Sequence, residues 1–289
     1  MGLSVNTNVA AINAYRNLST TQTSLSKSLE KLSSGFRINR AADDAAGLAI
    51  SEGLRSQISG LTQAARNAQD GISVVQTAEG ALTEVHSILH RMRDLAVQAA
   101  NDSNSTEARS NIVTEATQLQ AELKRIAEST NFNGTTLLDK VSGSTGATMN
   151  FQVGSAGDSS SRIAVDLSTA NVASVATAVS FAANASSTTG LSLFSHASAQ
   201  AAIKAIDTEI ATISTARANL GAYQNRFEHT INSVNVAVEN LSASESRIRD
   251  TDMASEMVNF TKSQIMSQAG TAMLAQANMI PQGVLQLLR

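Results

Sequence analysis

The sequence predicts a mainly α-helical protein: a long antiparallel, coiled-coil-like helical rod formed by both ends of the chain, with a small β-hairpin region in the middle. Three observations support this fold class. Apolar residues recur in long heptad rows on both flanks, the middle of the chain is rich in Ala, Ser, Thr and Gly, and the 289 residues contain a single proline, Pro281. Because proline kinks a helix at a cost of ~3 kcal/mol or more, its scarcity favours long helices.

Each flank carries an apolar row at seven-residue spacing, the pattern of packed helices. At ~1.5 Å per residue, each of these two helices would be ~70–80 Å long. Glycines at positions 53, 60, 71 and 80 each weaken a helix by about 1 kcal/mol, so we expect them where two backbones approach closely. The predicted rod core consists of Leu54, Leu61, Val75, Leu82 and Leu89 on one flank and Ile206, Ile213, Leu220, Phe227, Val234 and Leu241 on the other.

The outermost segments and a shorter helix complete the helical prediction. Asn104, with Glu107 three residues later, is the expected N-cap of a helix that stops near residue 131. Isolated helices are marginal in water, so the apolar rows at the chain ends need partners. These rows, the expected inner core, contain Leu18, Leu25, Leu29, Leu32 and Phe36 near the start and Met266, Met273, Ile280 and Leu287 near the end.

The middle of the chain shows a different pattern. Two runs with alternating apolar residues flank a turn-like segment and predict a β-hairpin near residues 147–168. Residues 169–195 show no firm period, and we interpret them as a short variable loop region with room for one further strand. The alternating residues are Met149, Phe151 and Val153 in the first run and Ile163, Val165 and Leu167 in the second.

Composition excludes several functional classes. The chain has no cysteine and a net charge of -3, which argue against disulfides, cysteine-bound metals and nucleic-acid binding. No apolar stretch has the length of a membrane span, and residues 1–8 lack the pattern of a cleaved signal peptide. His86 and His90 have a spacing that can bind metal, but we interpret them as surface residues, and Asp43–Asp44 and Asp250–Asp252 as helix caps. We therefore expect no enzyme activity, cofactor, metal, nucleic acid or membrane partner.

Four segments together resemble the bacterial flagellins. These are SSGFRINRAADDAAGLAI at residues 33–50, NFNGTTLL at 131–138, RDTDMA at 249–254 and LAQANMIPQGVL at 274–285. The matching flanks cover roughly residues 1–140 and 200–289, in the order of that family, and the short middle resembles a flagellin with little or no outer variable domain.

The resemblance implies a subunit that polymerises into the extracellular flagellar filament used for motility. Residues 1–43 with 252–289 would form an inner-core helical domain that is disordered in the monomer, and residues 44–251 a rod domain. The resemblance further implies type III export without a cleaved signal peptide, a chaperone at the C-terminal helix, and contacts with the filament cap and hook-associated proteins.

One recognition site also follows from the resemblance. Many flagellins bind the vertebrate Toll-like flagellin receptor through residues that align with Arg91, Leu95 and Glu115, and ordinary surface positions needed for lateral packing are the alternative reading. Two other functions remain open: a hook–filament junction protein and, from a different class, a secreted coiled-coil effector that acts on host membranes.

Overall fold

The computed structural model describes residues 7–139, 147–181 and 190–287, with side chains up to residue 279. The chain divides into two compact units, unit 1 (Met1–Ile58 and Glu239–Arg289) and unit 2 (Ser59–Val238). The division falls within two long helices, α2 (Ala45–Ala99) and α5 (His196–Arg249). The boundaries expected from the sequence, at 43/44 and 251/252, instead coincide with the turns next to these helices. Each unit combines residues from both flanks of the chain.

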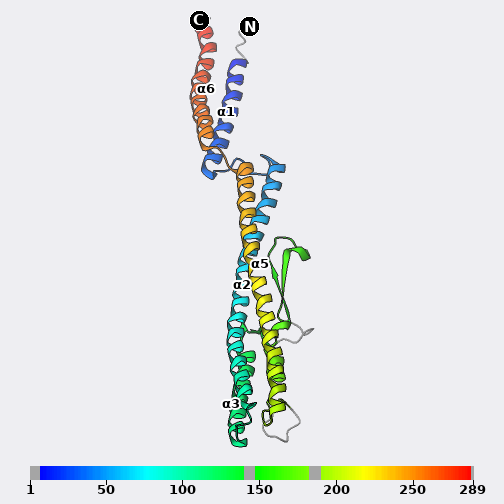
Figure 1. Cartoon of the computed structure of the whole chain (residues 1–289). Coiled ribbons are helices and arrows are strands. Elements are labelled where there is room, and N and C mark those ends of the chain that lie inside the picture. The colour runs from blue at the N-terminus through cyan, green and yellow to red at the C-terminus, as the bar shows by residue number, and fades with distance from the viewer. Residues whose placement is uncertain (1–6, 140–146, 182–189, 288–289) are drawn as a thin grey trace. The chain divides into compact units, whose positions relative to one another are not determined.

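In unit 1, helices α1 (Val9–Ser34) and α6 (Met253–Leu287) lie side by side and antiparallel (Figure 1). The amide of Asn8 donates to the carbonyl of Ala277 over 2.7 Å, at one end of the pair. Further along, a Cβ added to Gly270 would lie 3.1 Å from Leu18 Cδ1, so the helices approach closely there.

The turn between α1 and α2 pairs with the turn between α5 and α6. Gly35 ends α1 with φ +76°, a left-handed conformation that glycine adopts without steric cost. Phe36 then forms an antiparallel bridge with Asp250, and the Arg37 amide donates to the Arg249 carbonyl over 2.7 Å. The Arg249 guanidinium lies 4.7 Å from the centre of the Phe36 ring and binds Glu52 at 2.9 Å.

One acidic residue at each of these turns caps a helix, whereas Asp43 accepts from the Arg40 amide and Asp250 from the Ser246 hydroxyl. Asp44 accepts a 2.8 Å hydrogen bond from the Gly47 amide in the first turn of α2. Asp252 accepts from the amides of Ala254 and Ser255 at 3.0 and 3.2 Å, at the start of α6. A carboxylate there satisfies free amides and complements the positive end of the helix dipole.

In unit 2, α2 and α5 run antiparallel: residues later in α2 contact residues earlier in α5. Gly71 of α2 faces Phe227 of α5, and ion pairs join Glu79 to Arg217 and Arg93 to Asp207, at 3.6 and 2.6 Å. Eight of the predicted rod-core residues lie buried here: Val75, Leu82, Leu89, Ile206, Ile213, Leu220, Phe227 and Val234. Leu54, Leu61 and Leu241, nearer the division between the units, are half-buried.

Helix α3 (Thr106–Ser129) begins one residue later than expected, because Ser105 and not Asn104 is its N-cap. The Ser105 hydroxyl accepts from the Ala108 amide, whereas the Asn104 side chain donates to the Gln98 carbonyl in the preceding turn. A short hairpin follows, with β1 (Asn131–Phe132) and β2 (Thr135–Thr136) joined by a two-residue Asn-Gly turn. Both turn residues have positive φ, the geometry that this dipeptide favours.

The predicted hairpin is confirmed. Strands β3 (Thr148–Gln152) and β4 (Arg162–Asp166) pair antiparallel, with Met149 opposite Val165 and Phe151 opposite Ile163. The alternating apolar side chains point into the core, where Phe151 makes an edge-to-face contact with Phe227 of α5 at 5.5 Å between ring centres.

The prediction that residues 169–195 form a loop is wrong for their first part. A short 3-10 turn (Ser168–Ala170) leads into helix α4 (Val172–Ala178), which packs on α3. Asn171 caps α4 by accepting from the Ser174 amide, and Val172, Val175 and Val179 are buried. The side-chain spacing of 172, 175, 176 and 179 is helical, a signal obscured by the surrounding Ala, Ser and Thr.

Two of the four helix glycines have close neighbours, but the expected approach of another backbone holds at Gly60 alone, because the neighbour of Gly71 is an aromatic ring. A Cβ on Gly71 would lie 2.7 Å from Phe227 Cζ, and one on Gly60 would lie 3.0 Å from Ser155 Cβ. At Gly53 and Gly80 an added Cβ would meet nothing within 4 Å, so close packing does not explain them.

Candidate functional site

The contact between α1 and α6 uses heptad rows made largely of small or polar residues. On α1 the less exposed positions are Ala11, Leu18, Leu25 and Leu32 in one row and Ala14, Thr21 and Ser28 in the other. On α6 they are Glu256, Ser263, Gly270 and Ala277 in one row and Phe260, Ser267 and Leu274 in the other. Small side chains allow close approach but bury little apolar surface, so this contact leaves the larger apolar side chains of α6 unused.

The inner-core residues predicted from the sequence therefore separate into two groups. Leu18, Leu25 and Leu32 are half-buried, whereas Leu29 is 57% exposed and Phe36 lies at the turn. On α6, Met266 and Met273 are exposed, because they lie outside the rows that face α1. The side chains of Ile280 and Leu287 lie outside the described residues.

Exposed large apolar side chains are concentrated in unit 1. Among the described residues, all but Val97 and Val236 belong to this unit. Exposed apolar side chains gathered in one part of a chain indicate a surface that binds a partner. On α1 and the turn these residues are Val9, Ile12, Tyr15, Leu29 and Phe36, with Ile50 on α2, and on α6 they are Met253, Met257, Val258, Ile265, Met266, Met273 and Met279.

The outer face of α6 is the most apolar part of this surface. Val258 and Ile265 lie one heptad apart and are 67% and 61% exposed. Together with Thr261, Lys262 and the two flanking methionines, they line a shallow apolar hollow on a single helix. Neither residue was predicted from the sequence, although the heptad row of 258, 265, 272 and 279 is apolar throughout. We call this face, centred on Val258 and Ile265 and bordered by Met257 and Met266, the outer face of α6.

The three residues of the expected receptor site do not share one exposed surface. Arg91 on α2 and Glu115 on α3 form an ion pair, in which Nη2 and Nε of the arginine donate to the same carboxylate oxygen at 2.6 and 2.9 Å. Their side chains are 55% and 45% exposed. Leu95, however, is 2% exposed and packs in the core of unit 2, so the expected surface position of this residue is wrong. One helical turn separates the exposed Arg91 from the buried Leu95.

His86 and His90 interact with each other. Their Nε2 atoms are 2.9 Å apart and the rings meet edge to face. Burial, the nearby His90 and the Arg217 cation together lower the pKa of His86. His86 Nδ1 is buried without a hydrogen-bond partner, so a tautomer with the proton on Nε2, donated to His90, leaves no buried donor unpaired. A metal on His86 Nε2 would require the proton on Nδ1, and among the described residues no group of three or more potential ligands occurs.

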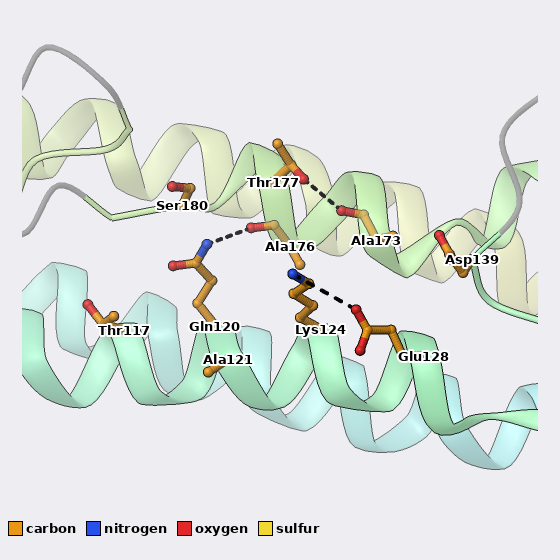
Figure 2. Close-up of a pocket in the computed structure, with 10 residues that line it drawn as sticks. All are labelled: Thr117, Gln120, Ala121, Lys124, Glu128, Asp139, Ala173, Ala176, Thr177 and Ser180. Atoms are coloured by element: carbon orange, nitrogen blue, oxygen red, sulfur yellow. Dashed lines mark hydrogen bonds and ion pairs between the residues drawn. The ribbon is translucent and has the colours of Figure 1, made fainter.

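A second hollow of about 500 Å³ lies between α3 and α4 (Figure 2). Several of its polar side chains already have partners. Gln120 donates to the Ala176 carbonyl at 3.1 Å, the Thr177 hydroxyl donates to the Ala173 carbonyl at 2.9 Å, and Lys124 pairs with Glu128 at 3.9 Å, as Figure 2 shows. The Gln120 contact joins α3 to α4, whereas the other two lie within α4 and within α3, so we interpret this hollow as a packing groove. In the described part of the chain, no helix is both long and apolar enough to cross a membrane.

Comparisons with known proteins agree with the sequence and the fold. Residues 5–143 match the bacterial flagellin N-terminal helical region, and residues 203–288 match the bacterial flagellin C-terminal helical region. The chain is 51% identical to a flagellin of Halalkalibacterium halodurans over 285 residues, covering 99% of both chains. It is 48% identical to the flagellar filament 33 kDa core protein of Treponema phagedenis, again over 99% of both. A crystal structure of Bacillus cereus flagellin covers 62% of this chain and 94% of its own, at 33% identity and a TM-score of 0.48. The chain therefore belongs to the bacterial flagellin family of structural filament subunits.

Proposed function

We propose that this chain polymerises with copies of itself into the extracellular flagellar filament, and that unit 1 supplies the apolar contacts between subunits. The observation that carries the proposal is the concentration of exposed large apolar side chains on α1 and α6. Contacts between different patches of identical subunits generate an open helical filament when the rotation between subunits does not close into a ring.

The small amount of apolar surface buried within unit 1 supports a coupling between the folding of this unit and assembly. Ordering the backbone costs about 1–2 kcal/mol per residue, which burial must offset. In unit 1, the buried apolar side chains among the described residues are Ile38 and Ala277 alone, whereas unit 2 has a continuous core. We infer that α1 and α6 become stably ordered only when neighbouring subunits cover them. Free subunits then stay soluble, and the filament grows where a tip offers partners.

Seeded polymerisation tests this proposal. Purified chain added to short filament seeds is expected to form long filaments visible by electron microscopy. Mild proteolysis of the free chain is expected to remove roughly 40 residues from each end, and filaments are expected to resist the same treatment. Failure to extend any seed would refute the filament function, and short caps confined to hook ends would favour a junction protein. Chain ends that resist protease before assembly would refute the coupling of order to assembly.

We also propose that partners cover α6 before and during assembly. An exposed apolar helix face attracts unwanted contacts, so a chaperone at the C-terminal helix would keep the subunit soluble until type III export without a cleaved signal peptide. The filament cap and the hook-associated proteins would then meet the same helices at the two ends of the filament. A chaperone that binds the full chain but is displaced by filament seeds would support shared use of this surface, whereas simultaneous binding of both would contradict it.

A receptor role is proposed for the Arg91–Glu115 pair alone. This pair is exposed and well ordered by two hydrogen bonds, which suits recognition by the vertebrate Toll-like flagellin receptor. The buried Leu95 would act by supporting α2 beneath it. Arg91→Ala is expected to reduce receptor signalling by the soluble chain. The matched control is Arg125→Ala, which breaks a comparable exposed pair with Glu122 on α3. Equal signalling by both variants would refute the assignment.

A further inference from the structure

The exposed methionines of the described chain all lie on α6. Met253, Met257, Met266, Met273 and Met279 are 48–63% exposed. In unit 2, by contrast, Met92 is fully buried in the core and Met149 is half-buried in the β3–β4 hairpin. Exposed thioethers react with oxidants far more readily than buried ones, so the two groups of methionines differ in reactivity by their positions in the fold.

The positions of these sulfur atoms connect oxidation to the assembly surface. Met257 and Met266 border the apolar hollow at the outer face of α6, and Met273 lies one heptad beyond Met266. A sulfoxide at these positions replaces an apolar, flexible side chain with a polar one. Burying it against a neighbouring subunit would leave its oxygen without a hydrogen-bond partner, unless the interface rearranges.

We propose that the exposed methionines of α6 form a modification site at which a hydroperoxide-class oxidant blocks polymerisation. This inference rests on the proposed assembly function. In the reaction, methionine Sδ donates an electron pair to one peroxide oxygen and the O–O bond breaks. That oxygen stays on sulfur as the sulfoxide, and the other leaves as water when the oxidant is hydrogen peroxide. Sulfur is oxidised by two electrons and the peroxide is reduced by two, so atoms and electrons balance.

The site acts on free subunits and spares assembled ones. In the free chain the thioethers face solvent, whereas in a filament neighbouring subunits cover them under the proposed function. Oxidation therefore lowers the supply of competent subunits without dismantling filaments already formed. Reduction of both sulfoxide epimers by methionine sulfoxide reductases restores the thioethers and reverses the block.

The experiment treats the full-length free chain with hydrogen peroxide, removes the oxidant with catalase, and measures seeded elongation. Peptide mass spectrometry locates the sulfoxides, with Met92 as an internal reference that remains unmodified. We expect the elongation rate to fall about tenfold or more, because losing the burial of one methionine side chain weakens the binding of a subunit to the filament end by about that factor. Treatment with the two reductases is expected to restore the rate.

Two variants locate the effect. Leucine at all five exposed positions preserves volume and apolarity, so this variant is expected to elongate equally before and after peroxide. The matched control, Met149→Leu, is expected to stay as sensitive as the natural chain.

Each outcome separates the two proposals. Natural chain that carries α6 sulfoxides but elongates at the untreated rate would overturn the modification site and leave the assembly function intact. Sensitivity that persists in the five-leucine variant would place the effect elsewhere and also overturn it. Untreated natural chain that never extends seeds would instead overturn the assembly function itself.

Discussion

Gly71 and Gly80 lie on the same helix, yet an identical substitution is expected to have opposite effects at these two positions. Replacing an exposed helix glycine with alanine stabilises by about 1 kcal/mol, because alanine loses less backbone entropy on folding. Gly80 is such a position, since an added Cβ would meet nothing within 4 Å. We therefore expect Gly80→Ala to raise the free energy of unfolding by about 0.5–1 kcal/mol.

At Gly71 the same methyl group would collide with an aromatic ring. Its Cβ would lie 2.7 Å from Cζ and 2.9 Å from Cε1 of Phe227. The Phe227 ring is fully buried and meets Phe151 edge to face, so it has little room to move away. Overpacking costs about 1–3 kcal/mol, which cancels or exceeds the propensity gain. We expect Gly71→Ala to destabilise by about 1–2 kcal/mol, which separates it from Gly80→Ala by about 2–3 kcal/mol.

Urea unfolding of the unassembled chain, followed by circular dichroism at low concentration, measures both variants. A second substitution checks the mechanism. Phe227→Leu replaces the aromatic ring with a smaller side chain and makes room for the added Cβ. The double variant with Gly71→Ala should therefore be more stable than the sum of the two single effects predicts. A coupling of about 1 kcal/mol would fit two residues in direct contact. If Gly71→Ala stabilised the chain as much as Gly80→Ala, the inferred close contact between α2 and α5 would be refuted.

Three further predictions concern other parts of the chain. Burial lowers the pKa of His86 in the folded chain below its ordinary 6.5. The contribution of neutral His86 to stability is therefore complete above pH 6.5 and is lost as the pH falls through the folded-state pKa. His86→Gln should flatten this part of the pH dependence of the free energy of unfolding, measured with urea. Asp44→Ala removes a helix cap and should lower the free energy of unfolding by about 0.5–2 kcal/mol. Thermal unfolding measures this loss, and an unchanged melting temperature would contradict the cap. Met273→Glu should slow seeded elongation strongly, whereas Val97→Glu, at an exposed position in unit 2 (48% against 63% for Met273), should not; equal slowing would argue against unit 1 as the assembly surface.

The core of unit 2 could be predicted from the sequence because both of its long helices, α2 and α5, carry apolar residues at seven-residue spacing. The rows through Leu82 and Ile213 are apolar without interruption, and each finds its partner within one chain. Alternation predicted the β3–β4 hairpin equally well, since its inner face packs on α5. Helix α4 escaped prediction because its stripe is short and its cap, Asn171, is surrounded by residues that are common in loops. In such a segment, packing on α3 and not intrinsic preference selects the helix.

Unit 1 could be predicted only in part, and the physical reason is also the main argument for assembly. Hydrophobicity ranks the row through Met266 and Met273 above the row through Gly270 and Ala277, so a sequence reading assigns the methionines to the core. Within one chain, α1 instead packs on the small residues, where backbones approach closely. A chain that evolved to be stable alone would place its large apolar side chains in that contact, because they bury far more surface. The large apolar side chains of α6 that lie outside this contact, such as Ile265, Met266 and Met273, are buried only when other subunits cover them.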